Sequence, residues 1–205
     1  MLPLDLSAPD TAGRIAEGVA QEGIGIRLLV NNAAFGRWGR FESWSEKDYR
    51  DMLQTNVASL VALTQRFLPA LAARTPSAVV NVTSAAAYQP VPFMAVYAAT
   101  KAFVMSFSQA LYGEWKDRGV LVQTLVPGPT ETEFDRAAGA YASAIKGRGS
   151  PVDVVHDCLS ALEHGDPVAL NAKGTFKQRF FAGLFPPRVV IAQVAKMFRP
   201  PADGH

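Results

Sequence analysis

Short apolar runs alternate with longer amphipathic segments along the chain. The apolar runs predict strands at Leu2–Leu6, Ile26–Val30, Ala78–Thr83, Val120–Val126 and Pro167–Leu170. Segments with helical periodicity predict helices at Ala8–Glu22, from Ser45 or Glu46 to about Ala73, Val96–Asp117, Pro151–His164 and Pro187–Phe198, with Ser7 or Asp10 capping the first of them. Apolar strands that alternate with helices are typical of a parallel sheet covered on both faces. The sequence therefore predicts an α/β fold, with residues 1–205 forming one domain.

Two of the expected helices contain long stretches without a charged residue. These stretches are Met52–Gln65 and Ala102–Gly113. A helix that lies on a sheet normally keeps one polar face toward solvent. We therefore expect the sheet to cover one side of each helix and a second subunit or partner protein to cover the other. The alternative is that loops of the same chain cover the second side.

Composition excludes several classes of protein. The net charge of +2 is too small to indicate a nucleic-acid partner. Cys158 is the only cysteine, which excludes an internal disulfide and fits a reducing, cytoplasmic environment. Met1–Asp10 has no signal-peptide pattern, and no apolar run is long enough to span a bilayer. The three histidines form no metal-ligand pattern, so no metal is expected.

Two tyrosine–lysine pairs with a spacing of four are candidates for acid–base chemistry. Tyr97 and Lys101 form one pair, and Tyr112 and Lys116 form the other on the same expected helix. A lysine ammonium one turn away favours the phenolate and would lower the tyrosine pKa, so that the phenol can exchange a proton with a substrate. Ser84 follows an expected strand, where parallel sheets bind ligands, and lies 13 positions before Tyr97. Because Ala99 takes the matching position before Tyr112, Ser84 favours the first pair.

Ser84, Tyr97 and Lys101 at this spacing resemble the catalytic residues of the short-chain dehydrogenase/reductase family. Further segments resemble family motifs in the same order. Leu4–Asp5–Leu6 resembles the strand end beside the adenine ring, Asn31–Asn32–Ala33 resembles the Asn-Asn-Ala-Gly turn, and Asn56 resembles the helix asparagine. Val126–Pro127–Gly128 resembles the segment that faces the nicotinamide, and Thr130 and Thr132 resemble the residues that contact the carboxamide and the phosphates. The resemblance is continuous from Leu2 to about Thr132.

This resemblance implies an oxidoreductase that transfers a hydride between NAD or NADP and a small carbonyl or alcohol substrate. Tyr97 would be the acid–base group, and Ser84 would hold the substrate oxygen. Lys101 would lower the tyrosine pKa and contact the nicotinamide ribose, and Asn56 would position a relay water. The implied cofactor contacts are Asp5, Asn32, Ala33, Tyr97, Lys101, Pro127, Gly128, Thr130 and Thr132. A homodimer or homotetramer would form through the two uncharged helices.

The sequence departs from the family pattern at its start. No Gly-rich turn leads from a strand into a helix, so the chain resembles the family from its third strand onward. Either the coding sequence begins upstream of Met1 or this is a truncated relative. The choice between NAD and NADP stays open, because the second strand of the family, which sets this choice, is missing. We expect impaired cofactor binding and an open edge on Ile26–Val30, which would aggregate, swap or recruit Leu2–Leu6. Ala34 also replaces the usual glycine of the turn.

Two further hypotheses follow from the pattern. A chain with this fold and no phosphate site could instead be an inactive binding or dimerisation protein. Lys173–Phe185 mixes cations with phenylalanines and is expected to close over the substrate, with an interfacial membrane segment as the alternative. Aromatic residues also hint at an apolar substrate pocket: Phe35, Trp38, Phe93 and Tyr141.

Overall fold

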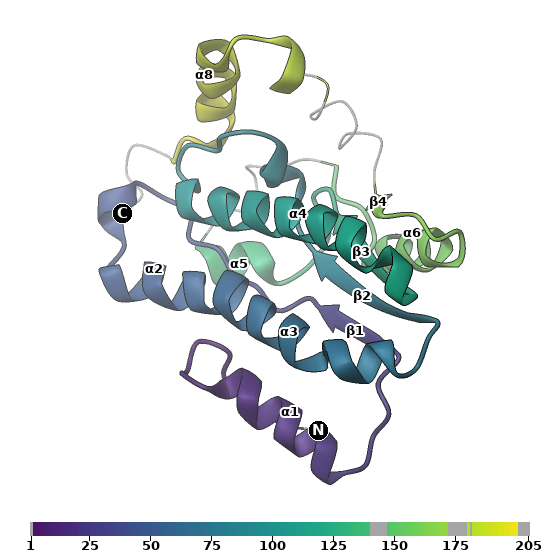
Figure 1. Ribbon diagram of the computed structural model, residues 1–205. Coiled ribbons are helices and arrows are strands. Elements are labelled where there is room, and N and C mark those ends of the chain that lie inside the picture. The colour runs from purple at the N-terminus through teal and green to yellow at the C-terminus, as the bar shows by residue number, and fades with distance from the viewer. Residues whose placement is uncertain (1, 140–146, 172–179, 181, 201–205) are drawn as a thin grey trace.

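Four parallel strands form one sheet in the computed structural model, which describes residues 2–139, 147–171, 180 and 182–200 (Figure 1). The strands are β1 (Leu28–Asn31), β2 (Ser77–Val82), β3 (Val120–Val126) and β4 (Val168–Leu170), in the order β1-β2-β3-β4. Their register places Val30 beside Val80 and Val80 beside Gln123. The α/β class is confirmed, and four of the expected strands form close to their predicted bounds. Tyr141 and most of Lys173–Phe185 lie outside the described residues.

Helices pack against both faces of the sheet (Figure 1). They are α1 (Thr11–Gln21), α2 (Glu46–Leu53), the π-helical segment η2 (Gln54–Ala58), α3 (Ser59–Ala72), α4 (Ala95–Trp115), α5 (Phe134–Ala138), α6 (Pro151–Glu163) and α8 (Pro187–Phe198), with short 3₁₀ turns at η1 (Phe41–Ser43), η3 (Ala85–Tyr88) and η4 (Lys116–Arg118). Because side chains alternate along a strand, Val79 packs with Phe67 of α3, whereas Val80 packs with Val154 of α6.

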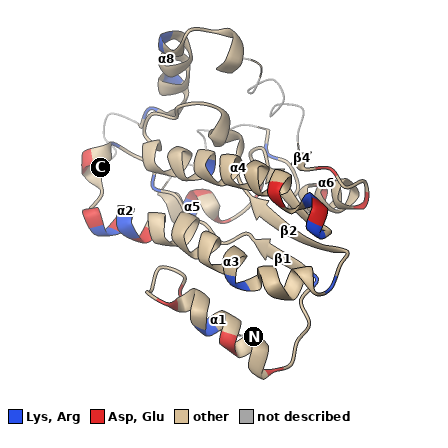
Figure 2. Cartoon of the chain, in the orientation of Figure 1, with Lys and Arg blue, Asp and Glu red and all other residues tan. Residues whose placement is uncertain are grey.

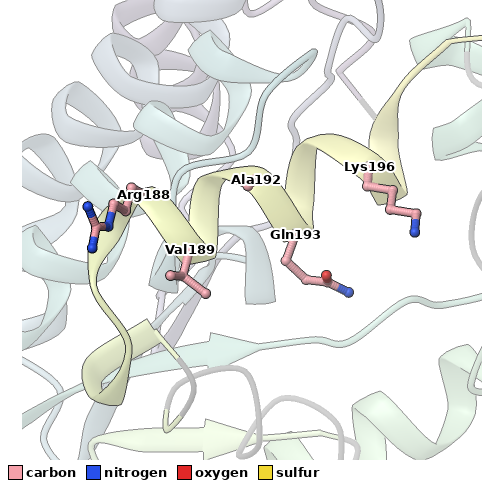
Figure 3. A pocket seen from close by; sticks show the side chains of 5 residues that line it. All are labelled: Arg188, Val189, Ala192, Gln193 and Lys196. Carbon is pink, nitrogen blue, oxygen red and sulfur yellow. The ribbon is translucent and has the colours of Figure 1, made fainter.

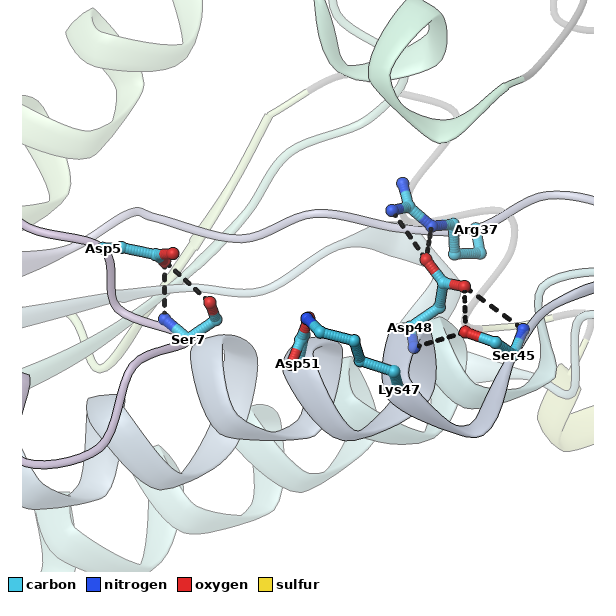
Figure 4. A network of polar contacts seen from close by, with 7 residues as sticks. All are labelled: Asp5, Ser7, Arg37, Ser45, Lys47, Asp48 and Asp51. Carbon is cyan, nitrogen blue, oxygen red and sulfur yellow. Dashed lines mark hydrogen bonds and ion pairs between the residues drawn. The ribbon is translucent and has the colours of Figure 1, made fainter.

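The first long helix is continuous from α2 through η2 to α3, as predicted. Ser45 begins it with a capping box, in which its Oγ accepts from the Asp48 amide and the Asp48 carboxylate accepts from the Ser45 amide. Arg37 holds the same carboxylate at 3.0 Å (Figure 4). The hydrogen bonds from Ser45, followed by those from Arg37, lower the pKa of Asp48. By contrast, Asp10 takes the N-cap position of α1, but its side chain makes no capping hydrogen bond.

The two uncharged helices differ in how their outer sides are covered. α1 packs along α3, with Ala12 in the same apolar cluster as Leu63, so this chain itself covers much of α3. Ala99, Phe103 and Ser106 of α4 are exposed, so the described loops do not cover that helix. Figure 2 shows few charged residues along both helices. Among the described residues, no helix has the length and apolarity that are needed to cross a bilayer.

The strand expected at Leu2–Leu6 does not form. The carbonyl oxygen of Asp5 accepts from Thr11 Oγ1 at 2.7 Å, and that of Leu6 accepts from Ser59 Oγ at 2.8 Å. These side-chain hydrogen bonds hold the segment against α1 and α3, so it is not recruited beside β1. The expected open edge is confirmed in the described residues, because β1 is the outermost strand and Leu28 and Val30 are 46% and 50% exposed. Aggregation or swapping through this edge stays a prediction.

Candidate active site

Ser84, Tyr97 and Lys101 meet at the carboxyl end of β2. Ser84 is the N-cap of η3, two residues after the end of this strand, and its Oγ accepts from the Ala86 amide at 3.2 Å. Tyr97 and Lys101 lie in the first turns of α4 and are only 8% and 4% exposed. The Ser84 hydroxyl is a hydrogen-bonding neighbour of the Tyr97 phenol. The structure therefore brings the three predicted side chains into one site, in which Tyr97 and Lys101 are buried and Ser84 is half-buried.

The competing pair lies at the other end of α4. Tyr112 is packed against the apolar cluster between α3 and the sheet, and Lys116 is exposed in η4. Tyr97 instead belongs to a second cluster with Trp38 and Met94, which Phe35, Phe93 and Phe134 join. Three of the aromatic residues expected around a substrate thus lie in the cluster that contains Tyr97.

Lys101 is anchored to the sheet rather than aimed at the phenol. Its Nζ donates to the Val82 carbonyl oxygen at 2.8 Å and lies 5.8 Å from the centre of the Tyr97 ring. Thr83 Oγ1 in turn donates to the Lys101 carbonyl oxygen at 2.7 Å. Burial lowers the pKa of Lys101 to about 8. The ammonium of Lys101 therefore loses its proton more readily than that of an exposed lysine.

The pKa of Tyr97 differs from the expectation. Burial raises it to about 12; hydrogen bonding to Ser84 opposes this rise, and the negative charge of Asp135 adds to it. The prediction that Lys101 lowers this pKa is wrong for the structure as it stands, because burial outweighs every favourable neighbour and the ammonium is held at Val82. Tyr97 is therefore a protonated phenol at neutral pH.

Asn56 fixes the wall of the site through its side-chain amide. It lies in η2, where Nδ2 donates to the Phe35 carbonyl oxygen at 2.9 Å and Oδ1 accepts from the Phe35 amide at 3.1 Å. Nδ2 also donates to Thr100 Oγ1 at 3.1 Å, and that hydroxyl donates to the Tyr97 carbonyl oxygen at 2.7 Å. π-helical segments are frequent at functional sites. The amide thus connects the loop after β1 to the turn that carries Tyr97, whereas its role toward a relay water stays a prediction.

A chain of buried polar side chains ties the ends of β1 and β2 to the helices. Asn31 Nδ2 donates to Asn81 Oδ1 at 2.8 Å and to Thr64 Oγ1 of α3 at 3.0 Å. Asn81 Nδ2 donates to Ser108 Oγ of α4 at 2.9 Å. Satisfied buried amides specify one packing arrangement, because an unpaired one is costly. This chain therefore fixes the strand end from which Asn32 and Ala33 continue.

Apart from Tyr97 and Lys101 on α4, the expected cofactor contacts lie after the carboxyl ends of β1 and β3, with Asp5 as the one exception. Asn32 and Ala33 are exposed directly after β1. After β3, the Pro127 carbonyl oxygen accepts from the Ala85 amide at 3.1 Å, Thr130 Oγ1 donates to the Gly128 carbonyl oxygen at 2.9 Å, and Thr132 Oγ1 accepts from the Phe134 amide. Both loops flank Ser84, as expected for a ligand site on a parallel sheet.

Asp5 is the exception. It lies in a loop rather than at a strand end, and its carboxylate accepts from the amide and the hydroxyl of Ser7, both at 2.8 Å (Figure 4). These two hydrogen bonds, first from the amide and then from the hydroxyl, lower the pKa of Asp5. The predicted strand end beside an adenine ring is wrong, because the strand that would carry it does not form.

The described residues fit one end of a nicotinamide cofactor better than the other. Lys101, Ser84 and the loops after β1 and β3 lie together at the carboxyl end of the sheet, where the resemblance predicts the nicotinamide and its ribose. α1 precedes β1, follows no strand of the described sheet, and begins beside the carboxylate of Asp10. A carboxylate at a helix N-terminus disfavours the binding of a phosphate there. The described part of the chain therefore offers no cradle of this kind for the pyrophosphate.

Sequence reasoning missed the close packing around Gly36. A Cβ built on Gly36 would lie 2.9 Å from Phe134 Cζ and 3.2 Å from both Met94 Cε and Tyr97 Cδ2. The Phe134 and Tyr97 rings are 5.0 Å apart, so α5 packs directly on the site. Asp135, the next residue, forms an ion pair with Arg148. The loop Asn32–Gly36 carried a signal in its terminal glycine, whereas nothing in the sequence pattern singled out Phe134 or Asp135.

Gly36→Ala is expected to lower the free energy of unfolding by about 1–3 kcal/mol, the usual cost of overpacking. Gly113→Ala is the matched control, since no atom lies within 4 Å of its built Cβ and it lies inside α4. The control should be neutral or stabilising by up to about 1 kcal/mol. Urea unfolding of the two variants measures both values. Equal stability of Gly36→Ala and wild type would show that the ring of Phe134 moves aside freely.

Comparison with known proteins agrees with the geometry. The family model for short chain dehydrogenase matches residues 1–142. The human very-long-chain 3-oxoacyl-CoA reductase is 31% identical over 137 residues, covering 62% of this chain and 41% of that protein. An uncharacterized oxidoreductase of Bacillus subtilis (strain 168) is 33% identical over 129 residues, covering 63% of this chain and 49% of that protein.

Solved structures share the fold. A short-chain dehydrogenase from Sphingobium yanoikuyae in complex with NADPH superposes with a TM-score of 0.77 at 23% identity, covering 98% of this chain and 75% of that one. The chain spans about two-fifths to half the length of the curated relatives it matches. The strands and helices of this chain are arranged as in that structure, and the family model matches most of the sequence. The chain belongs to the short-chain dehydrogenase family.

Proposed function

We propose that the chain catalyses hydride transfer between a nicotinamide cofactor and a small carbonyl or hydroxyl compound. The observation that carries this proposal is the meeting of half-buried Ser84 with buried Tyr97 and Lys101 in one site at the carboxyl end of β2. In this site Ser84 holds the substrate oxygen, Tyr97 exchanges a proton with it, and Asn56 positions the loop that forms the wall. When bound, NADH or NADPH would supply the hydride for carbonyl reduction, and NAD or NADP would accept it in the reverse direction.

The protonation state of Tyr97 favours reduction of a carbonyl at neutral pH. With a pKa of about 12, the phenol carries its proton and can donate it to an oxygen that becomes negatively charged. The hydroxyl of Ser84 then stabilises the phenolate. Lys101, whose pKa of about 8 leaves much of it charged at neutral pH, would contact the nicotinamide ribose. The reverse reaction, oxidation of an alcohol, would gain speed at alkaline pH.

Residues on three sides would hold the nicotinamide end of the cofactor. These are Lys101 on α4, Asn32 and Ala33 after β1, and the segment after β3 with Pro127, Gly128, Thr130 and Thr132. Solved relatives carry NADPH, NADP or NADH, so the choice between NAD and NADP stays open. Without a pyrophosphate cradle in the described residues, we expect weak cofactor binding and impaired activity. The cytoplasmic location and the single domain over 1–205 stay predictions.

Cofactor-dependent stabilisation tests the proposal directly. Millimolar NADPH or NADH at about ten times its Kd should raise Tm by about 2–6 °C, because ligand binding to the native state alone adds about 1.4 kcal/mol. Lys101→Met should reduce this rise, whereas Lys116→Met, at the matched spacing, should retain it. Oxidation of NADPH by a panel of aldehydes and ketones provides the catalytic readout. A folded chain that shows neither stabilisation nor NADPH oxidation at millimolar cofactor would exclude the proposal in favour of an inactive binding protein.

An interaction role has its own support in the exposed side of α4. Ala99, Phe103 and Ser106 lie on one exposed, uncharged stripe, and Phe103 stacks on Phe107 with ring centres 5.8 Å apart. Exposed apolar stripes of this kind mark protein–protein contacts. We propose that this stripe mediates a homodimer or homotetramer, in the active enzyme or in an inactive dimerisation protein.

Phe103→Glu is expected to shift the chain to monomer, because it would bring a carboxylate into an apolar interface. Light scattering coupled to gel filtration measures the molar mass. Val152→Glu on α6 is the control, since Val152 is also exposed but lies on another face of the molecule. Unchanged mass in Phe103→Glu would place the subunit contact elsewhere.

A further inference from the structure

The inner face of α8 is fixed against the wall of the candidate site. Val190 and Val194, one turn apart, are buried in the cluster that contains Trp38, Met94 and Tyr97. The Trp38 indole also donates to the Phe198 carbonyl oxygen at 2.9 Å, which holds the end of the helix. α8 therefore has a defined orientation, and its opposite face points away from the core.

This outer face carries positive charge and no negative charge. Arg188, Ala192 and Lys196 recur at a spacing of four, on the side of the helix opposite Val190 and Val194. Figure 3 shows Arg188 and Lys196 near the two ends of the helix, beside an open hollow of about 730 Å³ that Val189 and Gln193 also line. Two helical turns separate the cations by about 12 Å.

Within the part of the chain that the structure describes, no acid pairs with the cations of α8. The sequence contains no Asp or Glu from Pro167 to Pro200. Among the described residues, the ion pairs involve neither Arg188 nor Lys196 nor Arg199. Figure 2 accordingly shows Lys and Arg in blue on α8, and no Asp or Glu in red. The face can therefore meet an anionic surface without first breaking an internal salt bridge.

Large apolar side chains accompany these cations. Phe180 and Leu184, just before α8, are 63% and 64% exposed, and Val189, Ile191 and Met197 of α8 are also exposed. Leaving so many large apolar groups in water within one short stretch is unusual for a free surface. Exposed apolar groups interleaved with cations are typical of segments that lie in the interface of an anionic bilayer.

We propose that α8 and the residues just before it form a peripheral docking surface for an anionic lipid bilayer. Arg188, Lys196 and Arg199 would contact lipid phosphates, and Leu184 and Val189 would enter the boundary between headgroups and acyl chains. A helix of this length reaches about 18 Å, which is too short to cross the hydrocarbon core. A second copy of the chain is disfavoured as the occupant, because the same cations would face each other across the contact.

Vesicle co-sedimentation tests this surface without reference to catalytic activity. Wild-type chain should bind vesicles of phosphatidylcholine with phosphatidylserine at about 0.1 M salt and dissociate at about 1 M, where the Debye length falls to about 3 Å. Arg188→Gln/Lys196→Gln should lower the partition coefficient about thirtyfold, since each cation near an anionic membrane contributes about fivefold. Leu184→Ser, which keeps every cation, should weaken binding as well.

A matched variant separates this face from general charge attraction. Arg14→Gln/Arg118→Gln removes the same charge from exposed positions on α1 and η4 and should bind like wild type. Circular dichroism confirms that each variant is folded. The proposal is overturned if folded wild-type chain ignores phosphatidylserine vesicles at low salt, or if the two double variants lose binding equally. Self-association that the α8 variant abolishes, without vesicle binding, would overturn it in favour of a subunit contact.

Discussion

Tyr97→Phe is expected to lower kcat/KM for carbonyl reduction by about 100- to 10,000-fold, the usual contribution of a positioned acid–base group. This substitution removes only the phenol hydroxyl. Tyr97 is buried beside Ser84 at the carboxyl end of β2. Phenylalanine keeps the ring that packs on Phe134 and Met94. The site should therefore keep its shape while losing its proton donor. Steady-state oxidation of NADPH with a ketone substrate measures the effect.

Tyr112→Phe is the control, because Tyr112 has the same spacing to a lysine but lies in the other apolar cluster. It should retain wild-type kcat/KM. Cofactor stabilisation should survive in both variants, which distinguishes a lost proton donor from a lost binding site. Full activity of Tyr97→Phe would rule out this tyrosine as the acid–base group and with it the proposed mechanism.

The free energy of unfolding should rise with pH over an unusual range. The pKa of Lys101 is about 8 in the folded chain and 10.5 as its ordinary value. The unfolded chain therefore binds more protons between these values, so unfolding becomes less favourable as pH rises. Between pH 7 and pH 9.5 this group should add about 2 kcal/mol. Above pH 10 the raised pKa of Tyr97 acts in the opposite direction, because the unfolded phenol loses its proton first.

Lys101→Met should flatten this rise and stabilise the chain at pH 7 by about 2 kcal/mol, after the lost hydrogen bond to Val82 is counted. Urea unfolding at a series of pH values gives both quantities. Lys116→Met removes an exposed ammonium from η4 and should leave the pH dependence unchanged. A wild-type profile without a rise between pH 7 and pH 9.5 would mean that Lys101 reaches solvent easily.

The sequence pattern was sufficient for elements that are defined by their own residues. β3 forms at Val120–Val126 as expected, because a mostly apolar, Val- and Leu-rich run beside a Pro-Gly-Pro stop has few alternatives. Ser84 could be chosen over Ala99 because a strand end in a parallel sheet has a known relation to the following helix. Pairings between distant segments were harder: Leu2–Leu6 has the composition of a strand, yet its carbonyls bond to Thr11 and Ser59.

The electrostatics of the site could not be read from spacing alone. A separation of four residues places Lys101 near Tyr97, but it does not determine where the ammonium points or how far the site is shielded from water. The hydrogen bond to the Val82 carbonyl sets the direction of the Lys101 ammonium. The packing of Phe134, from a distant part of the chain, shields Tyr97 from water. Likewise, no periodic pattern predicts the π-helical turn that directs the amide of Asn56 to the backbone of Phe35.

The buried chain of Asn31, Asn81 and Ser108 has a consequence for how this sequence can drift. The Asn81 amide pairs with both Asn31 and Ser108, so exchanging Asn31 or Ser108 for an aliphatic residue leaves part of the Asn81 amide without its partner. Double exchanges, which remove donor and acceptor together, would cost far less. Among homologues these positions should consequently co-vary as a block, and a single odd member would mark a lineage in which the strand end has been rebuilt.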